Sequence, residues 1–464
     1  MEDPASAEDR GNGGRYQSFH GTQFVTLAVQ PPRTALRLIR MKNELRAAAG
    51  VVIAALLMAG CGSGAVTPPV MAHGVAIREP LADPRPYGAA DTAFGLDVLR
   101  AWCQADPRRN LVLSPSSLAS GLGMAYLGAH GGTAQAMARV LHLPAAGGGA
   151  TEAPQTLEPG LQARSAALRG LDGPGVTLDA SDQVWADPTL ETRRSYLNAV
   201  ATGYAAGVAQ APLLSHPDQS AQEINHAIAV ATKGQIPQLL PPGSLSHIGW
   251  VLTDALYMQA AWATPFQASQ TSPGPFTTAA GQQVTVPFMN GGPFRTVRAA
   301  GWTAVALPYR GGQLTMTALL PPAGASGCAP PSAPQLTAMT ARLTGPAAAR
   351  TSDIALPRVN LAVQVSMKAL LSELGMGVAF TGSADFTGLS PQACCIGLVR
   401  QAATLQVGEQ GTVASAATAV GMAPTAARVQ PPQVVFDRPY LMLVTAKASG
   451  EPLFLARVAN PAGP

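Results

Sequence analysis

The side chains that most often carry out catalysis show no catalytic arrangement in this sequence. Its seven histidines are scattered, and it contains no GxSxG nucleophile turn, HExxH metal motif, GxxxxGK phosphate loop or dinucleotide-binding glycine pattern. None of the five cysteines forms a CxxC pair, so we expect neither a structural zinc site nor a disulfide scaffold. The sequence therefore predicts a protein that is not an enzyme and that needs no metal or cofactor.

A segment near the C-terminus indicates a different chemistry, that of strand exchange. Residues 412–423 contain no charge and no proline, and most of them are small or β-branched. Alternate side chains of a strand face the same side, so the set Thr412, Ala414, Ala416, Thr418 and Val420 could all face a packed core. When exposed, such a segment readily pairs with a sheet. Its composition is consistent with an ordinary buried strand or with an exposed loop that can become one.

The spacing of apolar residues elsewhere in the chain predicts two helices. One covers residues 94–102, with Asp91 or Thr92 available as a cap, and the other covers residues 367–374 and stops at Gly375. Both show apolar side chains on a single face. These helices must pack that face against another layer.

Strand signals are concentrated in the second half of the chain. Apolar residues alternate over 284–288 and form a nearly continuous run over 314–320, while 440–446 and 452–459 read as a buried hairpin around a turn. Two segments rich in Ala, Gly and Pro, 144–175 and 322–350, are predicted to be surface insertions. Helices come first and strands later, without βαβ alternation, so the fold class is α+β.

The first ninety residues predict export. Residues 41–61 read MKNELRAAAGVVIAALLMAGC, with a charged start and an uncharged stretch that is too short to span a membrane. We expect 41–60 to be a signal peptide, 61–90 a tether rich in Gly, Pro and Ala, and 91–464 the folded domain. Residues 1–40 are either an upstream misreading, with Met41 the true start, or a genuine extension.

Composition limits the partners. Charged residues make up 12% of the chain, the net charge is +4, and no basic run is present. Nucleic acid is therefore not an expected partner. Hydrophobic residues make up 47% of the chain, which is ample for a large core. We expect a monomer.

Several segments, in order along the chain, resemble the serpin family of serine protease inhibitors. Together they span nearly all of residues 91–461. They are NLVLSPSSLASGLGMAYLGAHGGTAQAMARVLHLP (110–144), ATKGQIPQLLPPGSL (231–245), ALYMQAAWATPF (255–266), LPYRGGQLTMTALLP (307–321), ELGMGVAFTGSADFTGLS (373–390), VGEQGTVASAATAV (407–420) and FDRPYLMLV with GEPLFLARVANP (436–461). The resemblance implies the serpin fold, in which helices pack around a large mixed main sheet, with further smaller sheets and an exposed reactive-centre loop.

The resemblance also assigns residues to two regions. Those implied around the opening of the main sheet are Asn110, Ser114, Pro115, Ser117, Asp254, Trp262 and Gln401. Those implied in the hinge of the loop are Glu409, Gly411, Thr412, Ala414, Ala416 and Ala417. The family often has Asn and His where Asp254 and Gln401 stand here. An amide that faces a carboxylate can keep one hydrogen bond, so we expect the pairing to be rewired.

The scissile bond is placed by counting from Gly411 at the family's usual spacing, which gives Thr425 and Ala426. The small, apolar residues 422–425 favour an elastase-like or subtilisin-like protease. Cleavage between Arg428 and Val429 is the main alternative and would favour trypsin-like proteases, and Met422 is a third candidate. The loop departs from the family pattern at Gln410, Val413, Gly421 and Pro424.

The function implied by the resemblance is inhibition of a serine or cysteine protease. The loop is cut as bait and its N-terminal part then inserts into the main sheet. A non-inhibitory serpin-fold binding protein is the alternative, and a hydrolase with a hidden triad is a remote third.

One cysteine has a predicted modification, and the pairing of the other four is open. Leu57 to Cys61 resembles the lipobox of bacterial lipoproteins, except at Met58, and implies a lipid anchor on Cys61. The protein is then attached to the membrane outside the cytoplasm, or secreted if Cys61 is not lipidated. The pairing of Cys103, Cys328 and the vicinal Cys394 and Cys395 is left open by the sequence.

Overall fold

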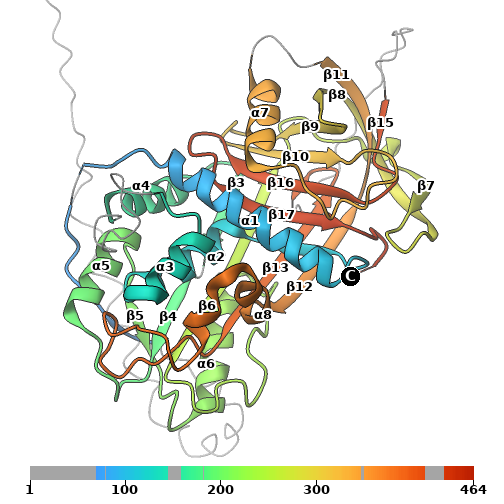
Figure 1. Cartoon of the computed structure of the whole chain (residues 1–464). Coiled ribbons are helices and arrows are strands. Elements are labelled where there is room, and N and C mark those ends of the chain that lie inside the picture. Colours follow the sequence, from blue (N-terminus) through green and yellow to red (C-terminus); the bar gives the residue numbers. More distant parts are fainter. Residues whose placement is uncertain are drawn as a thin grey trace, which may run out of the picture. The chain divides into compact units, whose positions relative to one another are not determined.

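The computed structural model describes residues 69–78, 80–144, 158–180, 182–345, 350–412 and 433–463. The chain divides into two units, residues 1–65 and 66–464, and every described residue belongs to the second. Within it, helices surround two sheets (Figure 1). The predicted α+β class is confirmed, because the sheets are covered by helices rather than interleaved with them.

The main sheet contains eight strands in the order β1-β5-β4-β6-β14-β13-β12, with β3 also paired to β6. Their bounds are Val70–Ala72 (β1), Val176–Ala180 (β3), Gln183–Ala186 (β4), Val208–Gln210 (β5), Trp250–Ala261 (β6), Val359–Ser366 (β12), Val399–Gly408 (β13) and Gly411–Thr412 (β14). Strand β6 runs parallel to β13, whereas β13 and β12 are antiparallel. The sheet is therefore mixed, as predicted.

The second sheet contains nine strands in the order β15-β11-β8-β9-β10-β16-β17-β2, with β7 paired to β8. Their bounds are Leu111–Leu113 (β2), Ser272–Thr277 (β7), Gln283–Ala299 (β8), Trp302–Pro308 (β9), Leu314–Leu320 (β10), Arg350–Pro357 (β11), Gln433–Val435 (β15), Tyr440–Ala446 (β16) and Pro452–Val458 (β17). Among the described residues, it has one strand more than the main sheet. The predicted strand over 314–320 and the hairpin of β16 and β17 are confirmed, and every residue of the hairpin strands is buried.

Eight α-helices are described. Their bounds are Arg85–Ala105 (α1), Pro115–Tyr126 (α2), Gly131–Val140 (α3), Glu158–Arg169 (α4), Arg194–Tyr204 (α5), Pro217–Ala231 (α6), Ala333–Thr344 (α7) and Lys368–Leu371 (α8). Helix α2 is buried along its whole length, packs against β6 and β17, and starts at Ser114, whose hydroxyl accepts a hydrogen bond from the Ser117 backbone N–H. A helix enclosed on all sides must be apolar or small all round, and the serines, alanines and glycines of α2 meet that need.

The core consists of three clusters. The largest joins α1 to α5, α7 and α8 to the strands that they cover, and the second fills the space between β6, β13 and the second sheet. The third lies beneath α6, against β4, β5 and β6. Figure 1 shows α6 at the opposite end of the molecule from β8 and β9.

Two expected surface insertions contain packed helices instead. Within 144–175, α4 buries Leu161, Ala163 and Arg164, and within 322–350, α7 buries Leu336, Met339 and Leu343. The prediction was wrong because the many Ala, Gly and Pro residues hide the few side chains at helical spacing that make the contacts.

The two predicted helices exist, but their ends needed correction. Helix α1 begins at Arg85, so Asp91 is not a cap but a buried residue inside the helix, and the Thr92 hydroxyl donates to the Gly88 carbonyl one turn earlier. Helix α8 ends at Leu371, one turn earlier than predicted, and a π-helical turn follows over Ser372–Met376. Gly375 breaks the helical geometry there with a φ of 109°, which favours glycine.

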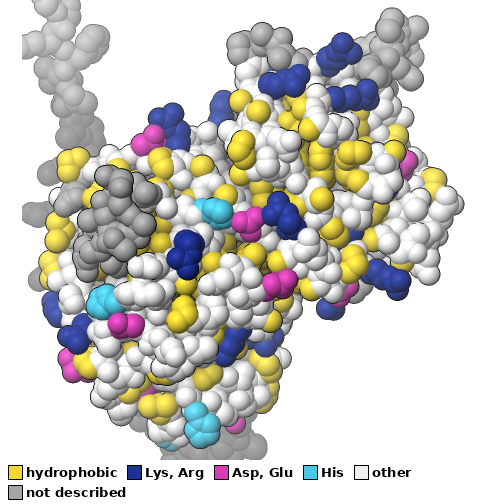
Figure 2. Space-filling view, in the orientation of Figure 1, with side chains coloured by type: hydrophobic (Ala, Val, Ile, Leu, Met, Phe, Trp, Pro, Cys, Tyr) yellow, Lys and Arg dark blue, Asp and Glu magenta, His cyan; other side chains and the backbone are white. Residues whose placement is uncertain are grey.

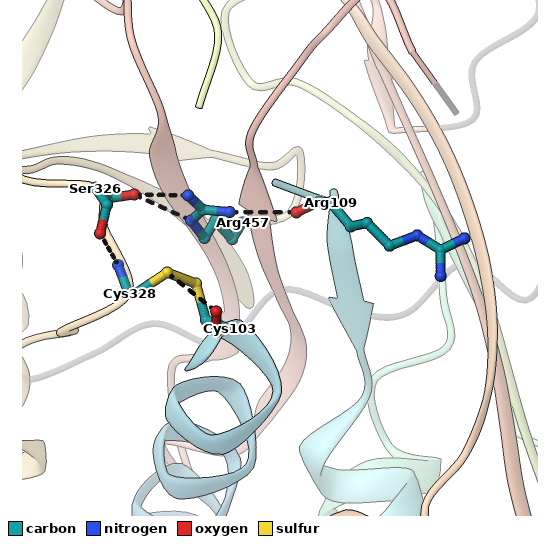
Figure 3. Close-up of a disulfide and its surroundings, with 5 residues drawn as sticks. All are labelled: Cys103, Arg109, Ser326, Cys328 and Arg457. Atoms are coloured by element: carbon teal, nitrogen blue, oxygen red, sulfur yellow. Dashed lines mark hydrogen bonds between the residues drawn. A yellow bond between two sulfur atoms is a disulfide. The ribbon is translucent and has the colours of Figure 1, made fainter. Parts of the chain in front are cut away.

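A disulfide joins Cys103, at the C-terminal end of α1, to Cys328 in the segment between β10 and α7 (Figure 3). Beside it, the buried Arg457 guanidinium of β17 donates to the Ser326 carbonyl at 3.0 and 2.9 Å and to the Arg109 carbonyl at 3.2 Å. Burial lowers the pKa of Arg457 to about 10. Of the pairings left open by the sequence, this one is present, and Cys394 and Cys395 are free thiols.

The surface carries few charges. On the face shown in Figure 2, basic and acidic side chains are dispersed singly or in small groups. No helix among the described residues is long and apolar enough to cross a membrane.

Candidate functional site: the junction of β6, β13 and β14

In the main sheet, β6 and β13 pair directly with each other at one end, and β14 lies between them at the other end. From Val399 opposite Leu252 to Ala403 opposite Leu256, β13 pairs directly with β6. Further along, the chain turns at the end of β13 and comes back as β14, which lies between the two strands and pairs antiparallel with both. The segment that follows β13 therefore already points into the seam between β6 and β13.

Gly411 is the first residue of β14 and must be glycine. Its φ is 153°, and a Cβ placed there would lie 2.0 Å from the carbonyl oxygen of Ala260 on β6. No side chain fits at that distance. The glycine of the predicted hinge therefore allows the returning chain to approach β6 closely enough to pair with it.

Thr412 is 1% exposed and lies inside the sheet. Its hydroxyl shares a hydrogen bond of 2.6 Å with the Tyr309 hydroxyl, which has no other described partner. The sequence placed Thr412 at the start of a loop outside the sheet, and this is corrected: Gly411 and Thr412 form strand β14 of the main sheet. Pairing on both edges satisfies their backbone groups, which an exposed loop would leave to water.

Trp262, directly after β6, holds the turn that leads into β14. Its indole Nε1 donates to the Gly408 carbonyl at 2.9 Å, and its ring stacks on Tyr309 with centroids 4.5 Å apart. Its backbone N–H donates to the Gln410 carbonyl at 2.9 Å. Tyr309 was not singled out from the sequence, although it lies in the LPYRGG motif, because its partners are distant in the chain.

Glu409 fixes the same turn from the outside. Arg358 Nε donates to Glu409 Oε1 at 2.7 Å, and the Thr271 hydroxyl donates to the same oxygen at 2.6 Å. Burial opposes the charge of this carboxylate, but the hydrogen bonds from Arg358 and Thr271 outweigh burial and lower its pKa. Glu409 is thus ionised and anchored where the chain leaves β13.

Asp254 of β6 and Gln401 of β13 stand opposite each other where the two strands pair directly. Gln401 Nε2 donates to Asp254 Oδ2 at 2.7 Å and to the Ser114 carbonyl at 3.0 Å. The hydrogen bond expected between them is therefore present, and it also ties β13 to the start of α2. Insertion of a further strand between β6 and β13 would have to break it.

The hydroxyl of Ser117 on α2 contacts two carboxylates, Asp254 Oδ1 and Asp182 Oδ1. One hydroxyl has one hydrogen to donate, so two ionised carboxylates cannot both be satisfied by it. Burial raises the pKa of Asp182 to about 7. Burial, followed by the nearby Asp182 charge, also raises the pKa of Asp254 well above its usual range. The pair therefore holds a proton near neutral pH.

Two other predicted residues have different surroundings. The Asn110 side chain binds the C-terminal segment, accepting from the backbone N–H groups of Ala459 and Asn460 at 2.8 and 2.9 Å. Pro115 opens α2 and lies close enough to Gly95 of α1 that a side chain at Gly95 would collide with it.

The remaining predicted site residues lie outside the described residues. They are Ala414, Ala416, Ala417, Thr425, Ala426, Arg428, Val429 and Cys61. In the described part of the chain, no three His, Cys, Asp or Glu side chains gather in a way that could hold a metal ion.

The main sheet thus contains a short strand, β14, which the segment following β13 forms between β13 and β6. A family model described as Serpin (serine protease inhibitor) matches residues 89–461, and the chain belongs to the serpin family. Serpins are generally protease inhibitors rather than enzymes.

Two relatives match along nearly their full length. The leukocyte elastase inhibitor of Bos taurus is 28% identical over 384 residues, covering 80% of this chain and 99% of the relative. Serpin B6 of Macaca fascicularis is 28% identical over 387 residues, covering 80% and 98%. The solved structure of thyroxine-binding globulin in complex with thyroxine superimposes with a TM-score of 0.69 at 23% identity, covering 81% of this chain and 99% of that one. At this identity the structural likeness shows the fold alone.

Proposed function

We propose that this protein inhibits serine proteases as a suicide substrate. The protease cuts a bond within the segment that follows Thr412. The serine of the protease then forms an ester with the new C-terminal carbonyl. The cut segment then inserts between β6 and β13 and carries the attached protease with it, which distorts the protease active site before water can release it. The observation that carries this proposal is the position of β14 between β6 and β13, where such an insertion would begin.

The orientation of Thr412 supports the proposal. Its side chain faces the interior, towards Tyr309, and alternate strand residues face the same side. A strand that continued from Thr412 would turn Ala414, Ala416, Thr418 and Val420 inward. All are small or β-branched and uncharged, as a strand that enters a packed interior requires.

Energetics also favour insertion. The direct contact between β6 and β13 is a parallel pairing, whereas an inserted strand that continued β14 would pair antiparallel with both neighbours. Antiparallel pairing is slightly more stable per residue, and insertion replaces one ladder with two. The uncut chain is then trapped kinetically in its less stable form.

The target is proposed from the loop sequence. Cleavage between Thr425 and Ala426 presents small apolar residues, which suit elastase-like or subtilisin-like proteases. The Bos taurus relative is itself named a leukocyte elastase inhibitor. Cleavage between Arg428 and Val429 remains the competing site, with trypsin-like proteases as its targets.

The test is incubation of the purified protein with elastase, subtilisin and trypsin, followed by a denaturing gel and mass spectrometry of the released C-terminal fragment. We expect a covalent complex and a fragment that begins at Ala426. Thr425→Asp should abolish the complex with elastase, whereas the control Arg428→Ala should leave it unchanged. Clean cleavage by all three proteases without any complex would contradict inhibition and favour a non-inhibitory binding protein.

We also propose that the protein is exported and tethered to a membrane through lipid on Cys61, as the sequence pattern of residues 41–61 suggests. Cys61→Ser should move the protein from the membrane fraction to the soluble extracytoplasmic fraction. If wild type and variant fractionate alike, the anchor is not on Cys61.

A further inference from the structure

Cys394 and Cys395 are neighbours in the chain, and their sulfur atoms lie 2.9 Å apart. They stand in the segment between Phe380 and the start of β13 at Val399. Both are free thiols, and the only disulfide among the described residues already uses Cys103 and Cys328. Each of the two thiols therefore has the other as its nearest sulfur partner.

The two thiols differ in access. Cys394 is exposed, whereas Cys395 is half-buried and forms part of the wall of a small apolar cavity with Trp250, Phe386 and Leu389. Burial, reinforced by the adjacent Cys394 and opposed by Lys368, raises the pKa of Cys395 to about 11. An incoming reagent can thus reach Cys394 first, and Cys395 is held behind it.

A metal site is the less favoured use of this pair. Metal ions that bind thiolates in proteins generally take further Cys, His or carboxylate ligands. No group of three such side chains that could hold a metal is found in the described part of the chain. Two thiols alone, one of them exposed, are the arrangement of a thiol–disulfide exchange site.

A disulfide between these neighbours would be of a different kind from the one at Cys103. The Cα atoms of consecutive residues are about 3.8 Å apart across a trans peptide bond, whereas ordinary disulfides join Cα atoms that are farther apart. The Cα atoms of Cys103 and Cys328 are 5.3 Å apart, within the ordinary range. A bond between Cys394 and Cys395 would be strained and hence easily reduced, so it would open and close while the other persists.

We propose that Cys394 and Cys395 form a reversible dithiol–disulfide redox site that exchanges with low-molecular-weight disulfides. The Cys394 thiolate attacks one sulfur of the incoming disulfide, which forms a mixed disulfide and releases one small thiol. Cys395 then loses its proton and attacks the Cys394 sulfur, which closes the Cys394–Cys395 bond and releases the second small thiol. Two protein thiols are oxidised and one small disulfide is reduced to two thiols.

The site lies next to the strands that the proposed function requires to separate. Ile396, which follows the pair, donates its backbone N–H to the Ala379 carbonyl at 2.9 Å, and three residues later Val399 pairs with Leu252 of β6. The closed ring would therefore constrain the segment leading into β13. The redox proposal itself does not depend on protease inhibition.

The test uses the full chain with oxidised glutathione, after which free thiols are blocked with a maleimide and the peptide containing both cysteines is weighed. We expect this peptide to be lighter by two hydrogen atoms, and to regain them in dithiothreitol at a concentration that leaves Cys103–Cys328 intact. Closure should become about tenfold faster for each pH unit between 7 and 9, because the Cys395 thiolate is its nucleophile. Two unmodified thiols, a lasting glutathione adduct or a link between two chains would each overturn the proposal.

Matched variants separate the two roles. Cys395→Ser should accumulate one glutathione on Cys394, because the second thiol is missing, and Cys394→Ser should react at least about tenfold more slowly. The reverse order of reactivity would contradict the assignment. Should a variant fail to fold, the peptide masses of the wild-type chain still decide the matter.

Discussion

The hydroxyl groups of Tyr309 and Thr412 share a hydrogen bond of 2.6 Å inside the main sheet, although the two residues are 103 positions apart. Thr412 belongs to the segment that the proposed mechanism inserts, and Tyr309 belongs to the body that receives it. In the proposed mechanism, Thr412 would therefore lead the inserting segment.

Thr412→Arg should convert the protein from inhibitor to substrate. A buried, unpaired guanidinium in place of a threonine that is 1% exposed would expel β14 from the sheet. We expect the yield of denaturant-stable protease complex to fall by at least about tenfold while cleavage continues. Thr337→Arg, on the exposed side of α7, is the control and should retain the wild-type yield. A wild-type yield from Thr412→Arg would refute the role of Thr412.

Gln401→Ala should loosen the closed part of the β6–β13 seam. It removes the donor to both Asp254 Oδ2 and the Ser114 carbonyl. The carbonyl still accepts from the Leu118 backbone N–H at 3.0 Å, whereas the buried Asp254 Oδ2 loses its described partner. We expect the free energy of unfolding to fall by about 1 to 3 kcal/mol in urea denaturation. Gln406→Ala on the same strand loses only a longer contact with Gln235, at 3.3 Å. It should change the free energy of unfolding by less than about 0.5 kcal/mol. Equal effects of the two variants would contradict the claim that the Gln401 hydrogen bonds stabilise the protein more than the Gln406 contact does.

The contribution of Asp182 to the stability of the protein should fall as pH rises from about 4 to 7. Burial raises the pKa of Asp182 from an ordinary 3.8 to about 7, so in this range the folded protein holds a proton that the unfolded chain releases. This contribution is greatest below the pKa that Asp182 has in the unfolded chain. It is lost as pH rises through the pKa that Asp182 has in the folded protein. Asp182→Asn cannot titrate, and its melting temperature should depend less on pH over this range. A variant profile parallel to the wild-type profile would contradict the assignment.

Arg164→Met should destabilise the helices beneath the sheet. The Arg164 side chain is 2% exposed, and it contacts Asp91 of α1 at 2.5 Å and Glu451 at 2.9 Å. Removing the cation leaves two buried acids without their partner. We expect the free energy of unfolding to fall by about 3 to 5 kcal/mol. The control Arg169→Met changes an exposed arginine on the same helix and should cost less than about 0.5 kcal/mol. A loss of less than about 1 kcal/mol on Arg164→Met would contradict this account.

The sequence predicted the elements whose signal is local. Strands β10, β16 and β17 are mainly apolar, and the break in helical geometry at Gly375 needs only a residue that tolerates positive φ. Asp91 was mistaken for a cap because its partner Arg164 lies 73 residues later, where no local rule connects the two. Helices α4 and α7 were missed because small residues dilute their apolar spacing.

The site was predictable only where the family resemblance reached. It brought Asp254 and Gln401 together, and the hydrogen bond between them is present. Tyr309 and Asp182 were not predicted as site residues, because their roles depend on contacts with residues that are distant in the sequence. The insertion of Gly411 and Thr412 was likewise hidden, since composition alone cannot say how far a strand has entered a sheet.

The central claim is that the uncut protein stores free energy which insertion of its loop releases. The measurement that tests it most directly is the melting temperature before and after a protease cuts the segment between residues 413 and 432. We expect the cut protein to melt higher by about 10 °C or more, since each kcal/mol gained raises the melting point by a few degrees. An unchanged or lower melting temperature after a single cut there would contradict the claim.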